Sequence, residues 1–279
     1  MRKAARGAEC REAADREDPS AEEASLPARQ GKDASGQTPP GRKEVLAGPH
    51  SRVGVMTIKL SPSTLNLFLE CPRCFWLDQN EGLKRPRGIF PSLPSGMDAR
   101  IKEYFDACRQ KGKLPVELEG KVAGQLLGDQ SLMDQWRARE GGLRYEDKER
   151  DALLKGLLDE CVVEDGAYIP LDYKTHGYGP KEEDLAGYYQ NQLDCYCFLL
   201  QENHHRIRPY AYLVYYTPKL VGEKGKVEFL VEPFKLKTDA SRARKTFESA
   251  VGLLQGPLPP FPGRCEYCAL EHRAERASV

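Results

Sequence analysis

Two aspartates, Asp159 and Asp172, lie equally far along the sequence on either side of a strong turn signal, and Lys174 follows two positions later. Asp165-Gly166 separates two β-like runs, and if these two residues form the loop, paired positions across the hairpin have numbers that sum to 331. Asp159 then faces Asp172, and alternation along the strand puts Lys174 on the same face. Like charges placed opposite each other destabilise a hairpin unless something neutralises them. The pattern therefore predicts a cation between the two carboxylates.

The chemistry of such a site would be metal-assisted hydrolysis. Carboxylate oxygens suit Mg²⁺ or Mn²⁺, which polarise a phosphodiester and lower the pKa of a bound water. Lys174 would add a compact positive charge near the phosphate. An isolated Asp-x-Lys is usually a surface pair on a half-exposed strand, and the facing Asp159 together with the apolar strand context makes the catalytic interpretation the better one. Pro170, inside the second run, predicts a strand edge or a bulge there.

Three short motifs resemble a known family. Gly156-Leu157-Leu158-Asp159, Leu171-Asp172-Tyr173-Lys174-Thr175 and Gln192-x-x-x-Tyr196 are similar to successive motifs of the RecB-type branch of the PD-(D/E)XK nucleases. The resemblance extends from about Leu60 to Cys268. It implies that Asp159 and Asp172 bind a divalent metal together with the Tyr173 carbonyl, and that Lys174 assists catalysis.

The same resemblance gives roles to a helix that follows the hairpin. Gln192 and Tyr196 lie one helical turn apart and would orient the lysine and the DNA backbone, although a polar and an aromatic residue also occur on ordinary amphipathic helices. Members of the branch often carry a further histidine ligand on the preceding helix, and residues 96–105 contain none. Asp98 or Glu103 could replace it, but neither is favoured.

Four cysteines form two distant Cys-x-x-Cys pairs, Cys71 with Cys74 and Cys265 with Cys268. Together they could close one four-thiolate site that joins the two ends of the folded region. AddB-like and CRISPR-associated iron-sulfur exonucleases are similar, but they have one leading cysteine and three near the C terminus. The resemblance favours a [4Fe-4S] cluster, with Zn²⁺ as the alternative and unliganded thiols as the third possibility. The other cysteines in apolar surroundings are expected to be buried thiols: Cys108, Cys161, Cys195 and Cys197.

Composition limits the setting. The chain has 279 residues with 42 basic and 42 acidic side chains, so no global positive field attracts nucleic acid and any DNA contact must be local. An odd number of cysteines, nine, without a secretory signal or an apolar run long enough for a membrane span predicts a cytoplasmic protein that does not contact membranes. Residues 1–55 lack Phe, Tyr, Trp and Ile and are expected to be a disordered tail. Residues 56–279 would form the nuclease domain.

The elements that must position these residues alternate between helix and strand. The sequence predicts helices that begin near Pro62, at 97–111, at 182–201 and at 240–255, and strands at 153–164, 167–175, 206–217 and 226–237. Residues 120–142 are expected to be helical in part. This order predicts an α/β fold with a restriction-endonuclease-like mixed central β-sheet flanked by helices.

The resulting hypothesis is a Mg²⁺- or Mn²⁺-dependent deoxyribonuclease in DNA repair, recombination or defence. Its partners would be DNA and a helicase or another repair or defence protein. One alternative is a catalytically silent DNA-binding or scaffold module with a structural metal, which the missing histidine favours. A second alternative is a zinc adaptor for a helicase. Sequence does not distinguish endonuclease from exonuclease.

Overall fold

Two β-sheets form the framework of the computed structural model, which describes residues 57–86, 88 and 92–269. The small sheet has the order β1 (Ile58–Leu60), β4 (Ala152–Gly156), β3 (Leu143–Asp147). The large sheet has the order β2 (Gln125–Leu126), β5 (Glu160–Glu164), β6 (Ala167–Thr175), β7 (Tyr210–Val221), β8 (Val227–Lys237). Strands β6 and β7 pair in parallel, and the other pairs of the large sheet are antiparallel. The predicted mixed sheet is thus confirmed.

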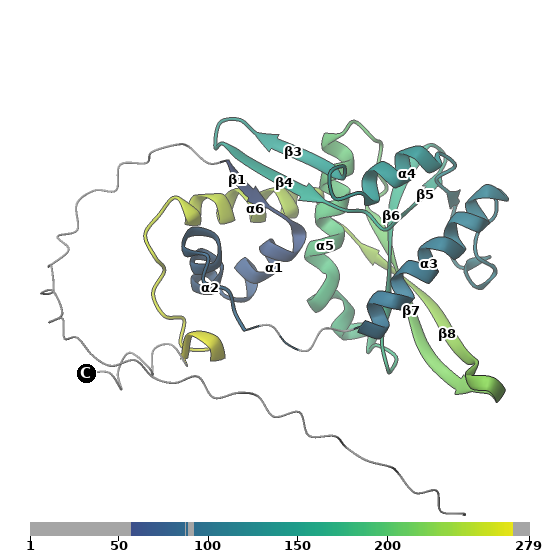
Figure 1. Cartoon of the computed structure of the whole chain (residues 1–279). Coiled ribbons are helices and arrows are strands. Elements are labelled where there is room, and N and C mark those ends of the chain that lie inside the picture. The colour runs from purple at the N-terminus through teal and green to yellow at the C-terminus, as the bar shows by residue number, and fades with distance from the viewer. Residues whose placement is uncertain (1–56, 87, 89–91, 270–279) are drawn as a thin grey trace, which may run out of the picture. The chain divides into compact units, whose positions relative to one another are not determined.

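Helices cover both faces of these sheets (Figure 1). They are α1 (Pro62–Glu70), α2 (Pro72–Trp76), α3 (Ser92–Gln110), α4 (Gln130–Arg137), α5 (Glu182–Glu202) and α6 (Ala240–Leu254), with short helical turns η1 (Leu77–Glu81), η2 (Val116–Leu118) and η3 (Glu223–Gly225). Ser61 caps α1 and Asp239 caps α6 through their side chains, as their types predict. In the part of the chain that the structure describes, no helix combines the length and the apolar character that crossing a membrane requires.

The β5–β6 hairpin has the predicted register. Asp165 and Gly166 have φ angles of 48° and 72°, and Glu164 pairs with Ala167. Positive φ at both loop residues matches the twist of the flanking strands. The ladder continues to Glu160 opposite Leu171 and ends there, so Asp159 lies one position beyond the last paired residue.

The prediction of one strand over residues 153–164 is wrong, because this run divides into β4 and β5 in different sheets. Gly156 ends β4 where α5 packs closest. A Cβ added at Gly156 would lie 2.6 Å from Leu199 Cδ1, so a larger residue there would require the buried Leu199 side chain to shift. The linking residues are held in part by the Leu158 N–H, which donates to the carbonyl of Trp136 at 3.2 Å.

Pro170 lies inside β6 without shifting the hairpin register, since it pairs with Cys161 in an unbroken ladder to β5. The irregularity that a proline requires is on the other side of the strand. Tyr168 bridges Ile207, whereas the parallel ladder to β7 resumes only at Leu171 opposite Tyr212, an offset of 41 instead of 39 residues. The missing N–H of Pro170 thus falls where pairing with β7 is interrupted.

Alternation along β6 divides its side chains between two cores. Leu171 and Tyr173 face α3, where the Phe105 ring centroid lies 5.5 Å from that of Tyr173. Asp172 faces α5, where Gln192 contacts it. The catalytic candidates therefore lie between the large sheet and α5, at the end of β6 where it pairs with the centre of β7.

Candidate active site

Asp172 and Lys174 form a buried ion pair on β6. The Asp172 side chain is fully buried, and Lys174 Nζ lies 2.5 Å from its Oδ2 atom. Gln192 Nε2 of α5 donates to the other oxygen, Oδ1, at 3.1 Å. The strand thus supplies the charges, and the helix packed above it fixes the carboxylate.

Asp159 lies beside Asp172, as the extended hairpin register predicts, and interacts with it electrostatically. It also has a partner that the sequence did not suggest, because Lys102 Nζ of α3 lies 3.1 Å from Asp159 Oδ1. Lys102 donates to Asp98 as well, at 2.9 Å. Three carboxylates, those of Asp159, Asp172 and Asp98, and two ammonium groups therefore lie in one cluster.

The positive charges only partly offset the cost of burying Asp172. Burial raises the pKa of Asp172, the attraction of Lys174 lowers it, and the repulsion of Asp159 raises it again, with a net pKa of about 7. Burial alone would lower the pKa of Lys174, but the charge of Asp172 raises it above its usual value. The lysine therefore stays protonated at neutral pH beside a carboxyl that is close to its midpoint.

Gln192 and Tyr196 meet at the same point, one turn apart on α5. Gln192 Nε2 donates to Tyr196 Oη at 2.7 Å as well as to Asp172. Tyr196 is buried, which raises the pKa of its phenol well above the usual range, so it acts as a neutral hydroxyl. Tyr173 also lies here, but its side chain belongs to the α3 core, and its main-chain carbonyl is the group it could offer to a metal.

Neither carboxylate considered as a replacement for the histidine is free to act alone. Asp98 is bound by Lys102 beside Asp159, whereas Glu103 is exposed and pairs with Arg100 at 2.7 Å. Glu103 thus points away from the site, and Asp98 reaches it only through the lysine.

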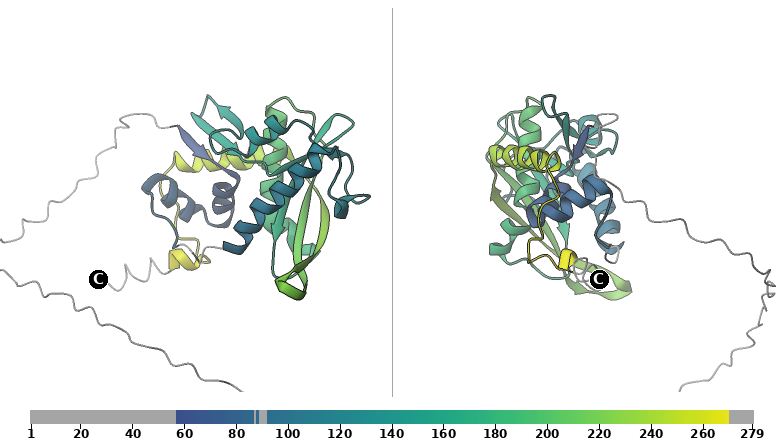
Figure 2. Two further views of the ribbon diagram at one scale, coloured as in Figure 1. Left: turned by 45° about the vertical axis from the view of Figure 1, so that its right-hand side comes forward. Right: turned by 90° about the vertical axis from the view of Figure 1, so that its left-hand side faces the viewer.

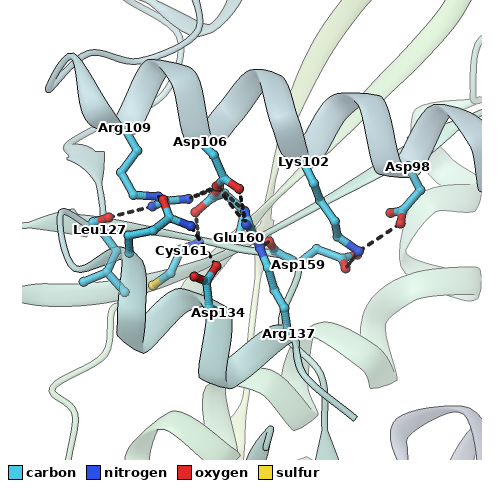
Figure 3. Close-up of polar contacts among 11 residues, drawn as sticks. Asp98, Lys102, Asp106, Arg109, Leu127, Asp134, Arg137, Asp159, Glu160 and Cys161 are labelled. Carbon is cyan, nitrogen blue, oxygen red and sulfur yellow. Dashed lines mark hydrogen bonds and ion pairs between the residues drawn. The ribbon is translucent and has the colours of Figure 1, made fainter.

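A buried network of charged side chains contacts the backbone at Asp159, and the sequence did not reveal it (Figure 3). Glu160 is fully buried, with Arg109 Nη2 of α3 at 2.6 Å and Arg137 Nη2 of α4 at 3.0 Å from its Oε2 atom. Arg137 Nε also donates to the main-chain carbonyl of Asp159 at 2.8 Å. Asp106 neutralises the second edge of Arg137 at 2.7 Å. This network fixes the backbone from which the Asp159 side chain projects.

One signal in the sequence could have revealed the network. Asp98, Lys102, Asp106 and Arg109 recur at spacings of three and four residues, which place them along one face of α3. Figure 3 shows these four side chains following each other along the helix toward Glu160 and Asp159. A charged helix face usually meets solvent, so the pattern alone did not distinguish this case.

The four cysteines of the two Cys-x-x-Cys pairs come together, and their sulfur atoms all lie within 4.8 Å of one another. Cys74 Sγ is 3.2 Å from Cys268 Sγ and 3.5 Å from Cys265 Sγ, and Cys71 Sγ is 3.7 Å from Cys268 Sγ. Figure 2 shows the yellow C-terminal segment returning to α2. The predicted joining of the two chain ends is therefore present as a four-thiol cluster.

The thiols of this cluster differ in acidity. Burial raises the pKa of Cys265, but hydrogen bonds from the Cys268 N–H and the neighbouring thiols lower it, to about 7. Burial and the other three thiols raise the pKa of Cys268, and burial also raises the pKa of Cys74, although a hydrogen bond from Arg85 lowers it. Arg85 Nη2 donates to Cys265 Sγ at 3.5 Å. The Cys265 thiolate therefore forms near neutral pH, whereas a bound cation would be needed to ionise Cys74 and Cys268 there.

Among the described residues, the remaining cysteines and histidines take no part in either cluster. Cys161, Cys195 and Cys197 are fully buried as predicted, but Cys108 is only half-buried. Among the described histidines, His204 is exposed while His176 and His205 are half-buried against aromatic rings. His50, His272 and the predicted tail over residues 1–55 lie outside the described residues.

The model of the PD-(D/E)XK nuclease superfamily matches residues 94–273, more than half of the chain. No protein with curated annotation matches. Two solved structures are similar. The crystal structure of SSO0001 has 14% sequence identity and a TM-score of 0.38, and the match covers 79% of this chain and 87% of that chain. An alkaline exonuclease from Laribacter hongkongensis has 13% identity and a TM-score of 0.33, and the match covers 78% of this chain and 94% of that chain.

Proposed function

The chain belongs to the PD-(D/E)XK nuclease superfamily, and on that premise we propose that it is a metal-dependent deoxyribonuclease of the RecB-type branch. The observation that carries the proposal is the arrangement of Asp159, Asp172 and Lys174 around one point between β6 and α5. The first two motifs that resemble that branch contain these three residues, and in the third motif Gln192 contacts the Asp172 carboxylate and Tyr196 contacts Gln192.

The carboxylates suit a divalent cation. Asp172 is fully buried next to Asp159, and burial and their repulsion raise its pKa to about 7 although Lys174 and Lys102 each pair with one of the two carboxylates, so a divalent cation would favour the ionised form of the pair. Oxygen donors in this arrangement match Mg²⁺ or Mn²⁺. Asp159, Asp172 and the Tyr173 carbonyl would hold the ion. When bound, it would supply Lewis-acid polarisation of the phosphate and a more acidic water.

The chain's own residues would do the rest. Lys174 keeps its proton and would place a positive charge against the scissile phosphate as negative charge develops there. Gln192 holds the Asp172 carboxylate in position and is itself fixed by Tyr196. The Arg137 contact to the Asp159 carbonyl would keep the two carboxylates at a constant separation. Pre-organisation of this kind reduces the cost of reaching the transition state.

A second candidate function has one observation in its favour. Lys102 neutralises Asp159 at 3.1 Å, which is what a catalytically silent DNA-binding or scaffold module that had lost its metal would need. The two readings differ in one outcome. Purified protein incubated with single- and double-stranded DNA, with and without Mn²⁺, should cleave DNA only with the metal, and Asp172→Ala should not. Absence of cleavage by the wild-type protein would favour the silent module.

We further propose that the four-thiol cluster holds a structural metal. A tetrahedron with metal–sulfur bonds of about 2.3 Å has edges of about 3.8 Å. Three of the six sulfur–sulfur separations are 3.2, 3.5 and 3.7 Å and all six are within 4.8 Å, a spread around that value, so the thiols as they stand suit one Zn²⁺ ion better than a larger cluster. The [4Fe-4S] cluster that the sequence resemblance favours would require them to spread. Elemental analysis for zinc and iron decides between the two.

The biological setting follows from the proposed chemistry. A nuclease of this branch would act in DNA repair, recombination or defence, with DNA as substrate and a helicase or a similar protein as partner. The proposed domain spans residues 56–279. A pull-down with the full chain, followed by mass spectrometry, tests for such a partner.

A further inference from the structure

A cavity of about 410 Å³ opens directly beside the candidate catalytic centre. It lies between the segment that follows β6, the first turns of α5 and the middle of β7. Its walls include the rings of His176, Tyr178, Tyr188, Tyr189 and Tyr215. A volume of this size accommodates a small planar molecule. Nothing in the proposed hydrolysis mechanism uses this cavity.

The floor of the cavity is a fixed aromatic cluster. The His176 ring stacks on Tyr215 with centroids 5.1 Å apart and an interplanar angle of 18°. His176 Nε2 lies 3.0 Å from Tyr189 Oη, and Tyr189 meets Tyr215 edge to face at 6.1 Å. Tyr215 is buried and also packs on Phe234. Tyr215 thus belongs to the core, and the partly buried His176 and Tyr189 rings pack against it to form an aromatic wall.

Two further rings at the rim are packed less: the Tyr188 ring meets the Tyr189 ring at a tilt with centroids 6.3 Å apart, and Tyr178 lines the cavity. Tyr178 is 78% exposed and Tyr188 is 71% exposed. Large aromatic side chains held in solvent contribute little to stability, so their presence on both sides of an aromatic cavity indicates a ligand with a flat apolar face. The charged lining residues, Lys181 and Asp184, are one of each sign. The cavity therefore suits a neutral ring better than a phosphate.

The cavity connects to the proposed catalytic lysine through one side chain. Lys174 Nζ lies 5.6 Å from the centroid of the Tyr189 ring, and it also lies 2.5 Å from Asp172 Oδ2. A nucleotide whose phosphate is at Lys174 would therefore bring its base to the cavity. Bases stack on aromatic side chains in proteins that bind single strands, whatever the sequence.

We propose that this cavity binds an unpaired nucleobase next to the scissile phosphate, so that the protein prefers single-stranded nucleic acid or frayed ends. The inference deepens the proposed nuclease function and rests on it. A base inside an intact duplex is stacked on its neighbours and would have to be extruded first. Tyr178 and Tyr188 act as stacking platforms.

The test measures binding without cleavage. The full-length protein is titrated against a short labelled oligodeoxyadenylate in the absence of divalent metal, and affinity is read from fluorescence anisotropy. Tyr188→Ala should weaken binding by about 5- to 100-fold, the range expected for one base–aromatic stack, and Tyr178→Ala should act in the same direction. Tyr188→Phe, which keeps the ring, should restore most of the affinity. Tyr104→Ala is the matched control, since this tyrosine is exposed on α3 and bonded to Glu117.

An abasic strand of the same length separates stacking from other effects. The affinities of wild-type protein and Tyr188→Ala for this strand should be equal, because no base is present to stack. A loss that persists on the abasic strand, or an unchanged affinity of Tyr188→Ala for oligodeoxyadenylate, would overturn the proposal. If the wild-type protein cleaves DNA with Mn²⁺ but shows neither effect, the base site fails while the nuclease function stands. If Tyr188→Ala weakens binding to oligodeoxyadenylate but not to the abasic strand, and the wild-type protein cleaves no DNA, the base site stands while the nuclease function fails.

Discussion

At the candidate centre, the folded structure disfavours ionisation of the Asp172 carboxyl group. Because burial and Asp159 raise its pKa to about 7 in the folded protein, folding favours the protonated form. The metal-free protein should therefore lose stability as pH rises from the ordinary range of an aspartate, near 4, to about 7, with no further loss above it. Each unit of pKa difference corresponds to ~1.4 kcal/mol.

Asp172→Ala should remove this dependence. Without added metal, the variant should gain stability relative to wild type between about pH 5 and about pH 8, because only wild type must ionise a buried carboxyl over that range. Urea unfolding at the two pH values measures the difference. The free energy of unfolding of each protein at one pH is compared with its own value at the other pH. The cost of the cavity left by the substitution is the same at both pH values and therefore drops out. Equal pH dependence in both proteins would show that Asp172 does not titrate near neutrality.

Lys174 offers a second test at this scale. Lys174→Ala should reduce cleavage by at least about 100-fold, the usual cost of removing one preorganised group that stabilises transition-state charge. Lys174→Arg should not restore it, since a wide planar guanidinium cannot take the place of an ammonium held between Asp172 and the Tyr189 ring. Cleavage rates under single-turnover conditions check both variants. Full activity in Lys174→Ala would remove this residue from the mechanism.

At the residue scale, the sequence could predict contacts between residues that are close along the chain, but not contacts between distant segments. Asp159, Asp172 and Lys174 belong to one hairpin, so a turn signal and strand alternation were sufficient to bring them together. Lys102 reaches Asp159 from α3, more than fifty positions earlier in the chain, and no local pattern links the two. The charge balance of the site therefore required the structure.

At the scale of elements, the structure differs from the sequence prediction in how strands are shared between sheets. Hydrophobic alternation continues through residues 153–164, and it carries no information on which neighbour each half pairs with. The chain leaves the small sheet after Gly156, where α5 lies so close that an added Cβ would displace the Leu199 side chain. The hairpin register, by contrast, was predictable because the Asp165-Gly166 turn fixes it locally.

The network around Glu160 connects α3 and α4 to the start of β5 and should dominate their stability. Glu160→Ala would leave the Arg109 guanidinium, which is 1% exposed, without its closest carboxylate. Breaking a buried pair in this way costs about 3–5 kcal/mol. Glu248→Ala removes an exposed partner of Arg244 and should cost about 0–1 kcal/mol. The free energy of unfolding from urea titration compares the two, and similar small losses would mean that the network contributes little.

Across the whole molecule, the four-thiol cluster joins segments almost two hundred positions apart in the chain. Metal binding and folding should therefore be one linked equilibrium, because closing so long a loop restricts the unfolded chain strongly. Cys268→Ser should lower the melting temperature sharply and reduce the metal content. Cys108→Ser, outside the cluster, should do little. Equal melting of both variants, with neither zinc nor iron present, would mean that the cluster is not a metal site.

The two Cys-x-x-Cys pairs show what sequence can predict at this scale. Their spacing indicated that they close one site, and the structure brings all four sulfur atoms together. The order of strands in the two sheets and the return of the C-terminal segment to α2 depend on packing between distant parts of the chain. The strand order and the path of the C-terminal segment produce no recognisable pattern in the local sequence. The α/β class, by contrast, follows from the order of helices and strands alone.

The dependence of the cleavage rate on Mn²⁺ concentration, for wild type and Asp159→Ala side by side, tests the central claim most directly. If Asp159 and Asp172 hold the catalytic metal, wild-type cleavage should saturate with Mn²⁺, and Asp159→Ala should need far more metal or stay inactive at any concentration. Arg208→Ala, which removes only contacts to Glu164 and Asp165 at the other end of the hairpin, is the matched control and should follow the wild-type curve. Cleavage by Asp159→Ala with an unchanged metal dependence would contradict the account.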